Sequence, residues 1–150
     1  MVAINMAVIR SLRVTRTPLQ MAAELGNIAA LQLLIKNGAA VNAEPAESGG
    51  GTALQLTAIG GFIGIAEELL KRGANVNAPP AKRQGRTALE RAVEHARIDM
   101  VGFPLNAGAK IRKSGHRQYD QLLKFAEGNG HRVVLEVLES FARIDENVMV

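Results

Sequence analysis

A repeat of 35 residues constrains this chain more than any other feature of its sequence. Three similar stretches begin at Thr17, Thr52 and Thr87, and they read TPLQMAAELGNIAALQLLIKNGAAVN, TALQLTAIGGFIGIAEELLKRGANVN and TALERAVEHARIDMVGFPLNAGAKIR. A leucine stands two positions after each threonine, and a glycine recurs at positions 38, 73 and 108. A period of this length indicates a chain built from stacked copies of one small unit.

Each copy has the pattern of two helices joined by a turn. Thr17 can cap a helix whose first turn accepts a proline, so a short helix is predicted over residues 18–25. Apolar residues recur with helical spacing over residues 28–36, which predicts a second helix. Gly38 is typical of the residue that ends a helix. Residues 39–51 are rich in Pro, Gly and Asn and are predicted to form a projecting turn, here called a finger.

A single pair of helices of this size cannot bury its own apolar stripe. Neighbouring pairs must stack to bury it, so stability belongs to the array and not to one unit. The spacing therefore predicts an all-α solenoid.

The repeated segments resemble ankyrin repeats. TPLQMAA, TALQLTA and TALERAV are similar to the family signature TPLHxAA, and NGAAVNA, RGANVNA and NAGAKIR are similar to its closing segment GADVNA. The resemblance covers about residues 17–141 and implies an α-solenoid of about three to four helix-turn-helix repeats joined by β-hairpin or loop fingers. The fingers are about two residues longer than usual, as in ankyrin arrays of fungal proteins. Gln20, Gln55 and Glu90 replace the family's histidine, so its hydrogen bond must be made differently or lost.

The repeats are expected at about 17–51, 52–86, 87–118 and 119–143, with 144–150 as a loose tail. Residues 1–16 break the period and are predicted to form a helix that caps repeat one. They could instead be the remnant of an upstream repeat in a longer array. A mitochondrial presequence is disfavoured because the three arginines are mixed with apolar residues along the helix.

Repeat three departs most from the pattern. Pro104 removes a hydrogen-bond donor from the second helix and crowds the preceding turn, and Gly102 weakens the same helix. A kinked or shortened helix is predicted over residues 98–105. A degenerate repeat near the end of an array is favoured over a functional hinge.

Composition excludes several classes of site. The absence of cysteine rules out disulfides and thiolate nucleophiles or ligands, and it suits a reducing intracellular compartment, cytoplasmic or nuclear. No apolar run approaches the roughly 18 residues of a membrane span. His95, His116 and His131 are too far apart to form a metal-binding pair on one helix, and no nucleophile stands beside a base. The chain is therefore predicted not to be an enzyme and to need no cofactor or metal.

Positive charge is concentrated in the later fingers. Residues 82–117 carry nine Lys and Arg against three acidic residues, whereas the whole chain has 18 and 14. Because equivalent fingers of stacked repeats lie side by side, these residues predict a basic ledge next to the acidic Glu44 and Glu47 of finger one. Such a ledge would attract an acidic partner electrostatically. The alternative is that these charges only keep the surface solvated and have no partner.

The resemblance implies a protein–protein interaction module with a concave groove of first helices and fingers. Leu56 and Ile59 are predicted to be its apolar anchor, and the arginines are predicted to pair with acidic side chains of the partner. The alternatives are a nucleic-acid-binding domain, for which stacking aromatics are lacking, or a self-assembling domain that dimerises through an exposed end repeat. The candidate partner-binding residues are Met21, Glu24, Leu56, Ile59, Lys82, Arg83, Arg86, Arg91, Glu94, Arg112 and Lys113.

Overall fold

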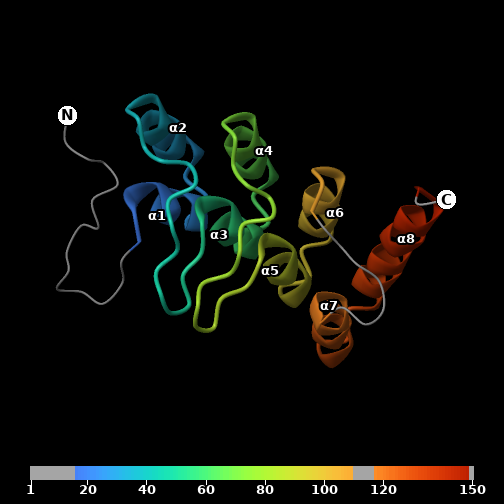
Figure 1. Ribbon diagram of the computed structural model, residues 1–150. Helices are drawn as coiled ribbons and strands as arrows, with labels where there is room; N and C mark the ends of the chain where they lie inside the picture. Colours follow the sequence, from blue (N-terminus) through green and yellow to red (C-terminus); the bar gives the residue numbers. More distant parts are fainter. Residues whose placement is uncertain (1–15, 110–116, 149–150) are drawn as a thin grey trace.

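The computed structural model describes residues 16–109 and 117–148, and Figure 1 shows them as a row of paired helices. Expectations for residues 1–15, including the capping helix, lie outside the described residues. No strand forms in the described ranges. Their helices are α1 (Pro18–Glu24), α2 (Ile28–Lys36), α3 (Ala53–Gly60), α4 (Ile63–Lys71), α5 (Ala88–Glu94), α6 (Ile98–Asn106), α7 (Arg117–Gly128) and α8 (Arg132–Val148).

The helices form two layers, as the repeat pattern predicts. The inner layer contains α1, α3, α5 and α7, each in contact with the next, and the outer layer contains α2, α4, α6 and α8. Between the layers lies one apolar core in which Leu19, Leu54 and Leu89 are almost fully buried at equivalent positions. Buried alanines on the inner helices let neighbouring backbones approach closely. The all-α solenoid is therefore confirmed.

The three inner helices of the first repeats start in the same way. In α1, Thr17 Oγ1 accepts a hydrogen bond from the Gln20 backbone, while Gln20 Oε1 accepts one from the Thr17 backbone. Thr52 with Gln55 and Thr87 with Glu90 repeat this reciprocal cap. Caps of this kind satisfy backbone N–H groups that a helix start leaves without partners.

Gln20 and Gln55, which stand where the family signature has histidine, also donate hydrogen bonds to the finger backbone. Gln20 Nε2 donates to the carbonyls of Ala43 and Glu44, both at 3.0 Å. Gln55 Nε2 donates to the carbonyls of Ala78 and Pro79 at 2.8 and 3.0 Å. An ionised Glu90 has no proton to donate, so its carboxylate serves only as the cap acceptor.

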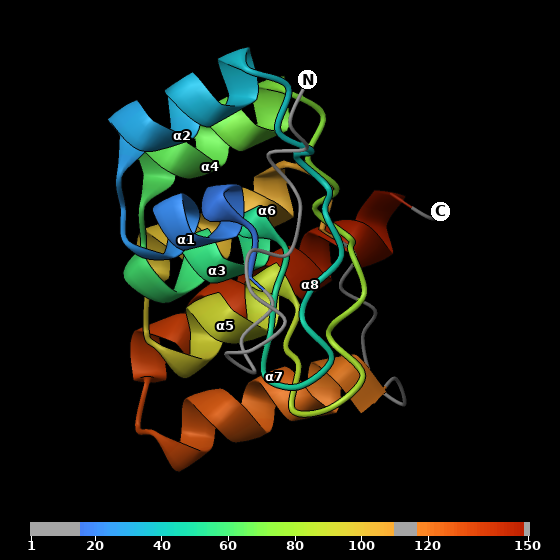
Figure 2. The ribbon, with the colours of Figure 1, turned by 90° about the vertical axis from the view of Figure 1, so that its left-hand side faces the viewer.

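The fingers of repeats one and two lie side by side (Figures 1 and 2), with their tips in register. Ser48 and Arg83, which are one period apart, form an isolated parallel bridge. The Arg83 carbonyl accepts from the Gly49 N–H at 2.8 Å, and the Arg83 N–H donates to the Glu47 carbonyl at 3.0 Å. Each finger is thus a loop paired with its neighbour rather than a β-hairpin paired with itself.

Asparagines tie each finger base to the next repeat. Asn42 Nδ2 donates to the Gly73 carbonyl at 2.9 Å, and Asn77 Nδ2 donates to the Gly108 carbonyl at 3.1 Å. Both glycines adopt positive φ angles after their helices, 86° and 90°, which a side chain would strain. The closing segment of each repeat is therefore ordered by the following one.

Of the kinked or shortened helix predicted over residues 98–105, the shortening is wrong, and so is most of the loose tail predicted after residue 143. Helix α6 is not shortened at Pro104: it has nine residues, as α2 and α4 have. Pro104 stands in the last turn, and its carbonyl accepts a hydrogen bond from the Ala109 N–H at 2.7 Å, as the carbonyls of Leu34 and Leu69 do in the other repeats. The expected tail after residue 143 is largely helical, because α8 continues to Val148.

None of the helices in the described ranges is long and apolar enough to span a bilayer.

Gln55→Glu tests the finger-holding bonds. The substitution keeps the cap acceptor but turns two donors into a carboxylate facing the carbonyls of Ala78 and Pro79. We expect the free energy of unfolding to fall by about 2 kcal/mol, measured by urea denaturation. Gln32→Glu on the exposed face of α2 is the matched control and should change stability little. Equal effects of the two variants would contradict the proposed role of Gln55.

Pro104→Leu tests the cost of the irregular outer helix. Leu34 and Leu69 stand at the equivalent positions of repeats one and two, so the variant restores the repeat residue and the missing N–H donor. We expect a gain of about 2 kcal/mol, with part of the roughly 3 kcal/mol helix cost offset by fitting a larger side chain. Thermal unfolding measures it. The reciprocal Leu69→Pro should destabilise by at least as much.

Candidate functional site

The candidate binding face is built from equivalent positions of the inner helices. Met21, Leu56 and Arg91 each stand four residues after a capping threonine, and Glu24, Ile59 and Glu94 stand seven residues after it. Their exposure nevertheless differs. Met21 is 50% exposed, whereas Leu56 is completely buried and Arg91 retains 7% of its exposure.

Leu56 is not the open apolar anchor predicted from the sequence. Gly51, at the base of finger one, lies so close that a Cβ there would be 3.3 Å from Leu56 Cγ and 3.3 Å from Arg91 Nη2. The finger base therefore packs onto Leu56. Ile59 is partly buried, and its carbonyl accepts a hydrogen bond from Arg97 Nε of the next repeat at 3.1 Å.

Arg91 is buried because it links two repeats. Its Nη2 donates to the carbonyl of Gly50 in the finger of repeat one at 2.8 Å. Burial, and next the positive charge of Arg16, lowers the pKa of the Arg91 guanidinium, while Glu94 and Glu24 oppose this shift. An arginine stays protonated at neutral pH despite such a shift. Arg91 therefore supplies a fixed positive charge below the face instead of a freely exposed one.

Arg86 is also engaged within the fold. Its Nε lies 3.8 Å from Glu94 Oε2, and its guanidinium lies over the ring of Phe125 at 4.9 Å from the centroid. A cation over an aromatic face is favourable. Arg86 thus joins the base of finger two to α7. Glu24 is similarly occupied, because it forms an ion pair with Arg16.

The tip of finger two carries the charges that remain open. Lys82 and Arg83 are exposed, and the Arg83 guanidinium lies 4.0 Å from Glu47 of finger one with both side chains largely solvated. An exposed pair of this kind contributes little to stability and can exchange partners. Arg112 and Lys113, also predicted for the ledge, lie outside the described residues.

The sequence reasoning missed the contribution of the glycines at the base of finger one. The composition of residues 39–51 predicts only a projecting turn, and it gives no specific role to the run from Gly49 to Gly51. The signal in the sequence is the lack of side chains at these positions. It lets the finger backbone approach Leu56, and it lets the Gly50 carbonyl accept a hydrogen bond from Arg91.

No cluster of potential metal ligands is found among the described residues. His95 is exposed at the end of α5, and His131 lies in the turn between α7 and α8, where its backbone N–H donates to the Ala126 carbonyl at 2.8 Å. Neither histidine contributes to the candidate binding face.

A family model for ankyrin repeats, in three copies, matches residues 19–114. The chain belongs to the ankyrin-repeat family. Ankyrin repeats are generally protein–protein interaction modules, and the two layers with projecting fingers seen here are the expected arrangement. No curated protein matches this chain. The family therefore gives the class of function, and the specific partner must be argued from the residues.

Arg91 is bonded within the fold, whereas Arg83 is exposed, and alanine substitution of each tests this difference. We expect Arg91→Ala to lower the free energy of unfolding by about 2 kcal/mol, because it leaves the buried Gly50 carbonyl without its donor. The control Arg83→Ala should stay within about 0.5 kcal/mol, as is usual at exposed sites. Urea denaturation measures both variants. An unchanged free energy of unfolding for Arg91→Ala would contradict the structural role of this arginine.

Proposed function

We propose that this ankyrin-repeat domain binds an acidic segment of a partner protein along its inner helices and fingers. The proposal is carried by two exposed cations, Lys82 and Arg83, on a finger tip whose backbone is bonded to the neighbouring finger; the Arg83 side chain has only a long, solvated contact with Glu47. A charge held on a fixed support loses little conformational freedom on binding.

The remaining charges of the face support the same preference. Arg91 is buried and Arg86 is partly buried, and both add positive potential at the bases of the fingers. Glu24 and Glu94 are neutralised in part by Arg16 and Arg86, so they oppose an acidic partner less than isolated carboxylates would. Met21, half exposed on α1, supplies an adaptable apolar contact. Arg112 and Lys113 extend the proposed ledge in the sequence.

The double variant Lys82→Glu/Arg83→Glu tests this function. Peptides would be selected on the full chain from a random display library, and binding would be measured by isothermal titration calorimetry at two salt concentrations. We expect the selected peptides to be rich in Asp and Glu, to bind more weakly as salt rises, and to lose at least ten-fold in affinity for the variant.

The matched control is Lys36→Glu/Lys71→Glu, which changes net charge equally but lies on the outer helices α2 and α4. It should leave binding of the selected peptides nearly unchanged. Peptides without acidic bias, or equal losses in both double variants, would contradict the proposal. Salt-sensitive binding of random DNA in place of peptides would favour the nucleic-acid alternative.

A further inference from the structure

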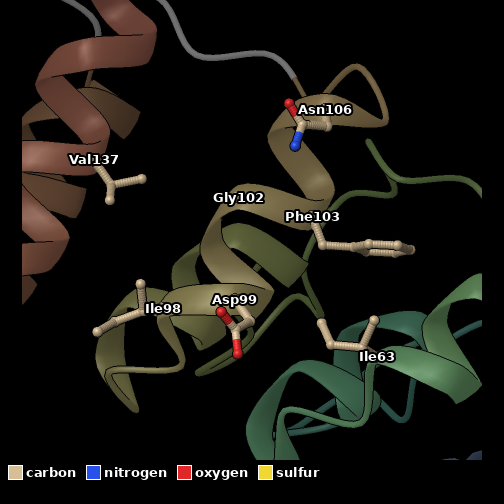
Figure 3. Close-up of a pocket in the computed structure, with 7 residues that line it drawn as sticks. All are labelled: Ile63, Ile98, Asp99, Gly102, Phe103, Asn106 and Val137. Carbon is tan, nitrogen blue, oxygen red and sulfur yellow. The ribbon is translucent and has the colours of Figure 1, made fainter.

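The outer layer contains an open depression that is separate from the inner helices and fingers. It has a volume of about 520 Å³ and lies between α4, α6 and α8 (Figure 3). This volume falls within the range of small ligand sites. The lining residues are Ile63, Ile98, Asp99, Gly102, Phe103, Asn106 and Val137.

The depression coincides with a change in the repeat pattern. Ile98, Gly102 and Asn106 are spaced four residues apart and therefore share one face of α6. The equivalent face is Ile28, Gln32 and Lys36 on α2, and Ile63, Glu67 and Lys71 on α4. Repeat three thus lacks the long polar side chains that cover this face in the other two repeats.

Gly102 leaves real space outside the helix. Apart from its chain neighbours and the nearby backbone of α6, a Cβ built there would meet no atom within 4 Å. A glycine inside a helix costs roughly 0.5–1 kcal/mol relative to alanine. No neighbouring atom requires a glycine at this position. The missing side chain leaves the floor of the depression open.

The walls are apolar, and one charge lies among the lining residues. Figure 3 shows Val137 of α8 pointing toward α6, while Phe103 extends on the side of α4. Ile98 is 44% exposed. Asp99 is exposed at the rim, and its carboxylate has no ion pair or hydrogen bond within the part of the chain described.

We infer that this depression is a second docking site, for a partner segment that inserts one large apolar side chain beside a Lys or Arg. The apolar walls would take the side chain, and the unpaired Asp99 carboxylate would pair with the cation. The preference is opposite in sign to that of the finger tips, so the two faces would take different partners. This inference does not depend on the proposed function of the inner face.

Nuclear magnetic resonance of the full chain with two matched small probes tests the site. 2-Phenylethylammonium carries a ring and a cation, and 3-phenylpropanoate carries a ring and an anion. We expect the cation to shift the amide signals of α6 and Val137 saturably, with a dissociation constant in the millimolar range. The anion should shift them much less.

Two variants separate binding from folding. Gly102→Gln restores the residue of repeat one and should abolish the shifts, while its melting temperature stays equal or rises. Asp99→Asn should weaken binding of the cation by up to about five-fold and remove the preference over the anion. The control is Glu67→Gln, which removes a carboxylate from α4 at the position equivalent to Gly102, and it should change neither the affinity nor the preference for the cation.

Three outcomes would overturn the inference. The first is the absence of saturable shifts at α6, or shifts that survive Gly102→Gln. The second is equal binding of both probes, which would remove the requirement for a cation. The third is a concentration-dependent dimer in sedimentation equilibrium that Gly102→Gln disrupts, because a second copy of the chain would then be the occupant.

Discussion

Burial of one helix pair against the next is the interaction on which the rest of this protein depends. Leu19, Leu54 and Leu89 are nearly inaccessible because each is covered by its own pair and by a neighbouring one. No repeat could bury this surface alone, so the array gains its stability at the boundaries. Small residues on the inner helices, such as the fully buried Ala58, keep the boundaries narrow. Close boundaries in turn bring the fingers within hydrogen-bond distance of each other.

The inner face results from a competition between folding and recognition for the same side chains. Arg91 and Arg86 have the charge expected of partner-binding residues, but the fold uses them to join a finger to α5 and a finger to α7. The tip of finger two remains exposed, and there Lys82 and Arg83 project from a backbone that is hydrogen-bonded to finger one. A partner would therefore meet two exposed cations at the tip, Lys82 and the weakly paired Arg83, while Arg91 contributes its charge from a buried position.

Local signals in the sequence predicted the elements of the fold well. Caps, glycines and apolar spacing act within one repeat, and they placed α1 and α2 to within one residue. Exposure on the inner face could not be predicted in this way, because it depends on how closely a finger approaches the next repeat. Leu56 is covered because Gly51 has no side chain. From the sequence, Gly102 and Pro104 indicate a weakened helix, but a helix propensity says nothing about the space left outside the helix.

The asparagine bonds that order the finger bases each cross a single repeat boundary. Asn42 reaches the glycine that follows α4, and Asn77 reaches the equivalent glycine after α6. A duplicated copy of the middle repeat would find on both sides the donors and acceptors that it already uses. Such an array can grow by tandem duplication of its gene segment, and each new finger can then change its tip residues without disturbing the older ones.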